Sequence, residues 1–210
     1  MSAQVRFAFA KATRSSRAAT EDRAEVFEDG DARVIVVADG AGGMRGGAAA
    51  SAALIDAVRS RLSEPLFDPT NIGSWSALFE ETDVWLARRL IGETTALLVI
   101  VGEHGIVGLS AGDSEAWIVS ANGIDRLTEA QPRARVGSGR CSFARFQRRD
   151  LDGTLVVGTD GLFKHADGAS IVAACLDRGP EAAEELAMLP RLASGRYPDD
   201  VAVVVVAHGS

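Results

Sequence analysis

The sequence has only two cysteines, no apolar run long enough for a membrane helix, and no excess of positive charge. Cys141 and Cys175 lie neither in a Cys-x-x-Cys pair nor near a histidine, which argues against a disulfide framework or a zinc site and favours a reducing compartment. The longest apolar stretches, Thr95–Val101 and Val201–Ala207, are far shorter than the roughly 20 residues of a membrane helix. Residues 1–12 also lack the apolar segment of a signal peptide. We therefore expect a cytoplasmic protein that does not enter membranes.

Charge and size exclude further classes. The 210 residues carry a formal net charge of −7, so the molecule as a whole does not attract nucleic acid or anionic lipid. Hydrophobic residues make up 47% and charged residues 24%, which are ordinary values for a globular protein and exclude a largely disordered one. The length predicts a single domain over residues 1–210.

Short β-branched runs alternate with helical segments along the chain. Strands are predicted at 33–38, 94–101, 106–110, 115–119, 155–158 and 201–207. Helices are predicted at 48–62, from an N-cap at Ser74 through Leu90, at 169–176 and at 181–189. Asn122-Gly123 is a hairpin signal, so the middle of the chain should form an antiparallel meander. The fold class is α+β, with antiparallel sheet and segregated helices.

Aspartates stand at the ends of several predicted strands. Asp39 and Asp160 each end an apolar strand and precede a glycine, Asp113 lies between two strands, and Asp199-Asp200 opens the last strand. A carboxylate in such a place is costly unless it is paired or binds a cation, so the set suggests one shared site for a hard divalent ion. The alternative is that each aspartate merely forms a turn or caps a helix.

The glycine-rich loop Gly40–Gly47 follows a strand and precedes a helix, as in sites that hold nucleotide phosphates. The dinucleotide fingerprint fails at Arg45, and no Gly-Lys-Ser/Thr follows, so neither common nucleotide motif is complete. Nucleotide binding stays open as an alternative.

Seven motifs occur in a characteristic order. They are RAATED (17–22), VVADGAGG (36–43), ETTALLVIV (93–101), LSAGDSEAWIV (109–119), GIDRLTEA (123–130), VVGTDGLF (156–163) and DDVAVVVV (199–206). Together they resemble the protein phosphatase 2C (PPM) family of metal-dependent Ser/Thr phosphatases, in its bacterial form. The resemblance spans nearly the whole chain. It implies two packed antiparallel β-sheets flanked by helices on both sides.

The resemblance also implies a site for two Mn²⁺ or Mg²⁺ ions and a third, weaker one. Asp39 matches the carboxylate that bridges the two ions, and Arg17 matches the arginine that binds the substrate phosphate. The other implied site residues are the Gly40 carbonyl, Asp160 and Asp199 as ligands, Glu21 acting through water with Asp22 as its support, and Asp113 at the third ion. A hydroxide between the two ions would then attack a phosphomonoester directly, without a nucleophilic serine or cysteine.

The implied function is a phosphoprotein phosphatase that acts on the substrate of a cognate Ser/Thr kinase. The chain departs from the family pattern at Thr20, Ala41, Glu93, Glu115 and Asp200. The segment around 131–152 is also short, so we expect the flap beside the active site to be short or absent. The departures at Thr20, Glu93, Glu115 and Asp200 motivate the alternative of a family member with little or no catalysis that binds a phosphoprotein or another partner.

A basic run lies in this short segment of an otherwise acidic chain. Its members are Arg133, Arg135, Arg140, Arg145, Arg148 and Arg149. They either guide phosphopeptides to the site or simply form a solvated face.

Overall fold

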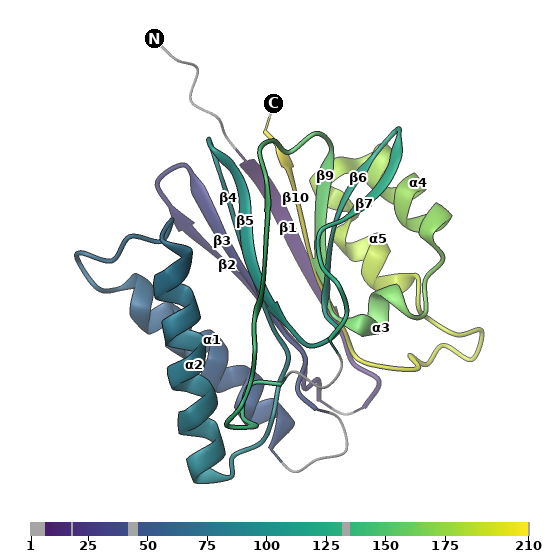
Figure 1. Cartoon of the computed structure of the whole chain (residues 1–210). Coiled ribbons are helices and arrows are strands. Elements are labelled where there is room, and N and C mark those ends of the chain that lie inside the picture. Colours follow the sequence, from purple (N-terminus) through teal and green to yellow (C-terminus); the bar gives the residue numbers. More distant parts are fainter. Residues whose placement is uncertain (1–6, 18, 42–45, 132–134, 210) are drawn as a thin grey trace.

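The computed structural model of the protein describes residues 7–17, 19–41, 46–131 and 135–209. Two five-stranded antiparallel sheets lie face to face, with helices outside each of them (Figure 1). One sheet has the order β1-β10-β9-β6-β7 and the other β2-β3-β4-β5-β8. The strands of the first sheet are β1 (Phe7–Arg14), β6 (Glu115–Ser120), β7 (Gly123–Arg126), β9 (Thr154–Gly158) and β10 (Val201–His208). Those of the second are β2 (Arg23–Asp29), β3 (Ala32–Ala38), β4 (Ala96–Gly102), β5 (Gly105–Ala111) and β8 (Ala144–Arg148).

The helices form the two outer layers. α1 (Gly47–Leu62) and α2 (Ile72–Arg89) pack on the sheet that contains β3. The other sheet is covered by α3 (Asp160–Phe163), α4 (Gly168–Arg178), the 3₁₀ turn η1 (Gly179–Ala182) and α5 (Ala183–Met188). The four layers are therefore helix, sheet, sheet, helix (Figure 1). This is the predicted α+β class with two packed antiparallel sheets.

Alternation along the inner strands explains why they read as continuous apolar runs. Ile35 and Val37 of β3 face the other sheet, whereas Val34 and Val36 face α1 and α2. β10 repeats the pattern, with alternate valines in the core between the sheets and in the core beneath α4 and α5. Side chains of a strand point to opposite faces in turn, and here both faces are covered. Every position must then be apolar.

The start of α2 differs from the prediction. The N-cap is Asn71, whose side chain accepts a hydrogen bond from the backbone N–H of Gly73 at 3.0 Å, and Ser74 lies inside the first turn. Asparagine caps helices at least as well as serine, so the cap three residues earlier prevails. At the other end Leu90 is the exposed C-cap in a left-handed conformation rather than a helical position. Within the described residues, no helix combines the length and apolarity that a bilayer crossing requires.

The short segment after β7 contains no helix in its described part, 135–152. Val136 forms a β-bridge with Thr94, and β8 then pairs with β5 at the edge of its sheet. A short flap around 131–152 and a single domain over 1–210 stay predictions. Residues 42–45 of the glycine-rich loop, and Arg133 of the basic run, lie outside the described residues.

Candidate metal centre

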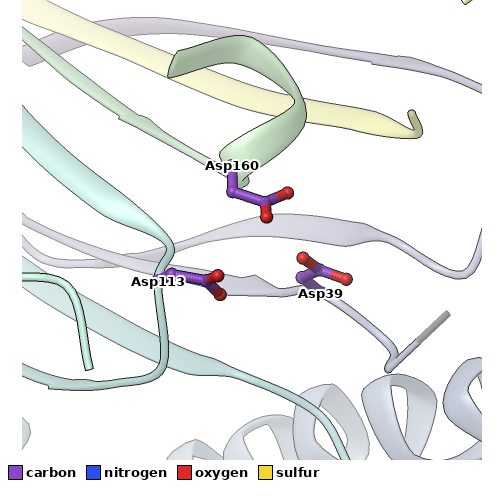
Figure 2. Close-up of side chains that lie close together, drawn as sticks. All are labelled: Asp39, Asp113 and Asp160. Atoms are coloured by element: carbon purple, nitrogen blue, oxygen red, sulfur yellow. The ribbon is translucent and has the colours of Figure 1, made fainter. Parts of the chain in front are cut away.

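Three carboxylates from different loops converge at one edge of the two sheets. Asp39 follows β3, Asp113 lies between β5 and β6, and Asp160 begins α3 directly after β9. One oxygen from each lies within 4.8 Å of the others, and the three side chains point toward a common centre (Figure 2). Among the described residues this is the group of three acidic, histidine or cysteine side chains close enough to hold a metal ion. The strand ends thus bring together aspartates that are 47 or more residues apart in the sequence.

Burial and mutual repulsion make the ionised carboxylates of this group unfavourable unless a positive charge lies nearby. Burial raises the pKa of Asp39 well above its usual range, and the charges of Asp22 and Asp160 raise it further. Burial also raises the pKa of Asp22, although a hydrogen bond from Thr159 opposes this. Oδ1 of Asp113 in the group and Oδ2 of the neighbouring Asp22 are buried and have no hydrogen-bond partner. A divalent cation would compensate all of these carboxylates at once.

A cavity of about 340 Å³ opens over the carboxylates. Seven of the eight predicted site residues line it, namely Arg17, Glu21, Asp22, Asp39, Gly40, Asp160 and Asp199. The eighth, Asp113, joins the site through its contact with the other two carboxylates. Asp199 is exposed at the rim and lies outside the group of three, and its Oδ1 accepts a hydrogen bond from the backbone N–H of Asp200 at 2.9 Å. The structure therefore brings the predicted residues to one cavity, with Asp199 outside the group of three carboxylates.

A larger cavity of about 540 Å³ lies on the other side of Asp22, between β1, β2 and α1. Its charged walls are largely paired among themselves, through Lys11 with Glu25, Arg14 with Glu184 and Arg59 with Asp56. Such pairs leave no concentrated charge for a ligand, so the chemistry belongs to the smaller acidic cavity.

Backbone contacts hold Asp39 in place. Its N–H donates to Thr95 Oγ1 at 2.9 Å, and its carbonyl accepts hydrogen bonds from Thr94 Oγ1 at 2.9 Å and from the Thr95 N–H at 2.8 Å. Thr95 Oγ1 also bonds to Ser114 Oγ at 2.8 Å, next to Asp113. The two threonines of the ETTA motif therefore connect two of the three carboxylate-bearing loops.

Close backbone approaches explain the two glycines that follow the aspartates. A Cβ on Gly40 would lie 2.6 Å from the Gly47 carbonyl group, at the start of α1. A Cβ on Gly161 would lie 1.8 Å from the carbonyl oxygen of Asp200. Both distances are below any real carbon contact, so only glycine fits.

No protein-family model matches the sequence, and the search of curated proteins returned no match. Solved structures do match. The S. agalactiae serine/threonine phosphatase superposes with a TM-score of 0.84 at 20% identity, covering 95% of this chain and 98% of that one. Stp1 from Staphylococcus aureus gives 0.83 at 20% identity, covering 98% and 96%. The catalytic domain of PstP, in complex with two manganese ions, gives 0.81 at 19% identity, covering 98% and 100%.

The chain has the fold of the bacterial serine/threonine phosphatases. The fold expected from the resemblance to the protein phosphatase 2C family is thereby confirmed. The match covers nearly the whole chain, including both sheets and both helical layers.

In this phosphatase fold Asp200 has a role that its sequence position did not reveal. The buried carboxylate accepts hydrogen bonds at Oδ1 from the N–H of Ser16 at 2.7 Å, from its hydroxyl at 2.8 Å and from the Ser15 hydroxyl at 3.3 Å. Its Oδ2 accepts from the N–H of Glu21 at 2.8 Å. Asp200 therefore anchors both ends of the loop that carries Arg17.

Other departures from the family pattern also have local partners. Thr20 Oγ1 accepts from the N–H of Asp22 at 3.0 Å. The Glu93 carbonyl accepts from the N–H of Ala41 at 3.0 Å, and Glu115 accepts from Trp117 Nε1 at 2.7 Å. These residues fit the structure around the acidic cavity.

Two cationic side chains that were not predicted as site residues also lie at the site. Arg135, one member of the basic run, lines the same cavity as Arg17. Lys164 contacts Asp113 and Asp160 directly. The second contact has i,i+4 spacing on a helical turn, a signal that sequence inspection could have used. Arg135 was predicted only as a member of the basic run, and Lys164 was not predicted to be a site residue.

Proposed function

We propose that this protein is a metal-dependent phosphatase that hydrolyses phosphoserine and phosphothreonine monoesters in proteins. The observation that carries the proposal is the meeting of Asp39, Asp113 and Asp160 within 4.8 Å at the base of an acidic cavity. Carboxylate oxygens are the ligands that Mg²⁺ and Mn²⁺ prefer, and the unpartnered Oδ1 of Asp113 fits such a use. The PstP catalytic domain, which shares the fold, binds two manganese ions.

The residues present fit a site for two Mn²⁺ or Mg²⁺ ions. Bound there, two divalent ions would activate a water molecule and stabilise the charge of the phosphoryl group. We assign Asp39 to both ions and propose as further ligands the carboxylates of Asp160 and Asp199 and the Gly40 carbonyl. Glu21 faces the cavity and would act through water, with Asp22 beside it.

We propose that Arg17, which lines the cavity, binds the phosphate. Its side chain is 59% exposed, and Nη1 lies 3.8 Å from Glu21 Oε2. An exposed ion pair of this length contributes little, so the guanidinium can turn to a phosphate and offer two parallel N–H donors. The loop that carries Arg17 is held by Asp200, which fixes the distance between the arginine and the carboxylates.

Phosphopeptide hydrolysis with Mn²⁺, with and without EDTA, tests the proposal. We expect turnover that EDTA abolishes and that Asp39→Asn nearly eliminates while the protein stays folded. Asp152→Asn removes the same charge from an exposed loop position and should leave turnover unchanged. Near-normal turnover in Asp39→Asn would contradict the role of Asp39. Folded protein that binds phosphopeptide but shows no turnover with any divalent metal would favour a non-catalytic binding module.

Arg135 offers a second contact for a phosphoprotein substrate. It lines the cavity together with Arg17 but comes from the segment that precedes β8. We propose that it binds the peptide next to the phosphorylated residue. Arg135→Ala should then raise KM for a phosphopeptide more than for p-nitrophenyl phosphate, which has no peptide. Arg145→Ala, at an exposed position on β8, is the matched control. Equal KM changes on both substrates would sink this assignment.

We also propose a cytoplasmic location and a substrate phosphorylated by a Ser/Thr kinase. Cys141 and Cys175 are both free thiols, as suits a reducing compartment. Burial raises the pKa of each to about 12, so neither is a reactive thiolate at neutral pH.

A further inference from the structure

Lys164 contacts two carboxylates of the acidic group. Its Nζ donates to Asp113 Oδ2 at 3.1 Å and to Asp160 Oδ2 at a shorter distance. Both carboxylates are nearly buried, with side chains 10% and 12% exposed. Lys164 therefore links two of the three carboxylates that define the site.

The local backbone directs this side chain into the site. Lys164 caps α3, a single helical turn that begins at Asp160, and its N–H donates to the Asp160 carbonyl at 2.8 Å. Side chains four residues apart on a helix share one face, so Lys164 stands directly over Asp160. Asp113 reaches the same ammonium from the loop between β5 and β6.

The sequence led us to expect a third, weaker ion at Asp113, and in the structure Lys164 lies between Asp113 and Asp160. A divalent ion there would have to approach each carboxylate oxygen to about 2.0–2.6 Å. An ammonium group hydrogen-bonded to both Oδ2 atoms occupies that space and already supplies a positive charge. The two cations cannot share the position.

We propose that the Lys164 ammonium is a built-in substitute for a third metal ion, so that this site takes two divalent ions rather than three. The inference rests on the proposed function, since it concerns the metal content of that site. Lys164 holds Asp113 and Asp160 together without metal through their Oδ2 atoms, and it leaves Asp39 and the other oxygen of Asp160 for the two exchangeable ions. It is a positioning residue for the carboxylates.

Metal counting tests the inference without using activity. Equilibrium dialysis against Mn²⁺, with free Mn²⁺ measured by its EPR signal, gives the number of ions bound per chain. We expect two ions in the wild type and three in Lys164→Met. The additional ion should disappear again in Lys164→Met/Asp113→Asn. Lys164→Arg keeps the charge and should bind two.

Lys11→Met is the matched control, because it removes an equal charge from a lysine that pairs with Glu25 and lines the other cavity. It should bind two ions. Three ions in the wild type, or the same number in the wild type and Lys164→Met, would overturn the inference. An equal count of two would leave the proposed function standing, whereas no bound ion in either protein would remove the proposed function as well.

A second readout is the stability of the metal-free protein. In EDTA, Lys164→Met removes the ammonium that contacts Asp113 and Asp160, and the variant should unfold at a lower temperature than the wild type. Saturating Mn²⁺ should restore most of the loss, because the ion takes the place of the ammonium. A variant as stable as the wild type in EDTA would show that Lys164 does not neutralise the group.

Discussion

Asp200 gives the sharpest test of how the site is held together. Its carboxylate accepts one hydrogen bond at Oδ2, from Glu21, and three at Oδ1, two from Ser16 and one from Ser15. Asp200→Asn keeps one oxygen, which can serve the donors at Ser15 and Ser16. The new NH₂ group then faces the N–H of Glu21, so one charge-assisted bond is lost and two donors oppose each other.

The size of the effect follows from that count. A hydrogen bond to a charged group contributes about 1.5–3 kcal/mol, so Asp200→Asn should destabilise the protein by about that amount. For a chain of this length each kcal/mol lowers the midpoint of thermal unfolding by about 2–4 °C. The expected shift is therefore about 3–12 °C. Ser16→Ala removes only the hydroxyl bond and should cost about 1 kcal/mol.

The pH dependence adds a second constraint on the same variant. Burial raises the pKa of Asp200, but the hydrogen bonds from Ser16, Glu21 and Thr20 outweigh it, so the pKa lies below its usual value. A lowered folded pKa gives stability that is present above the ordinary carboxyl pKa of about 3.9 and is lost as the pH falls through the folded value. The gap between wild type and Asp200→Asn should therefore narrow below about pH 4.

Urea unfolding in EDTA, followed by fluorescence between pH 3 and 8, measures these differences. EDTA keeps bound metal from masking the effect on the loop. An Asp200→Asn protein as stable as the wild type at pH 7, or more stable, would refute the reasoning. It would mean that the second acceptor oxygen of Asp200 contributes nothing.

The remaining predictions concern charge, space and loop anchoring. In EDTA the wild type should lose stability relative to Asp39→Asn as the pH rises from 5 to 9. The pKa of Asp39 is higher in the folded than in the unfolded protein, so folding takes up a proton and becomes less favourable as the pH rises. A pH-independent gap in urea unfolding would contradict this. Gly161→Ala should lower the free energy of unfolding by about 3 kcal/mol or more, because the new Cβ would overlap the Asp200 carbonyl oxygen. A variant with normal thermal stability would contradict that close contact. Asp83→Ala should cost about 2–4 kcal/mol by urea unfolding, since the buried carboxylate accepts three backbone N–H bonds of 2.6–2.9 Å from residues 137–141. It should also weaken phosphopeptide binding through the displaced Arg135, and an unchanged KM would separate that loop from the site.

Strand position in the sheet decided which elements could be predicted from sequence. All six inner strands (β3, β4, β5, β6, β9 and β10) were predicted within a few residues. The four edge strands β1, β2, β7 and β8 were not bounded, although Asn122-Gly123 indicated the hairpin that leads into β7. Inner strands are covered on both faces and must be apolar throughout, whereas an edge strand such as β1 mixes buried Phe7 and Ala12 with exposed Lys11. The mixed pattern does not stand out from a loop.

The candidate site divides in the same way. Asp39 and Asp160 were recognisable because each ends an apolar run and precedes a glycine, a local signal. Asp200 and Asp83 were not, because their roles depend on contacts with residues 179 and 54 or more positions away. Lys164 has a local signal in its i,i+4 spacing from Asp160, but its contact with Asp113 spans 51 positions. Nothing in their immediate sequence marks those distances. The motifs predict the carboxylates of the site, whereas the residues that position them are identified only by tertiary contacts.

Backbone contacts that do not involve the carboxylates explain why the carboxylates can be held so close together. The Asp39 backbone is fixed by Thr94 and Thr95, and the start of α3 is fixed by the close approach of Gly161 to Asp200. Neither contact involves a carboxylate of the group of three, so the positions do not depend on a bound ion. The packing free energy of the two apolar cores on either side of each inner strand therefore offsets the repulsion among the carboxylates. A cation that binds there meets ligands already in place, and the free energy of their repulsion adds to its affinity. Removing metal should accordingly lower the stability of this protein without unfolding it, unlike a small domain whose fold is built around its metal.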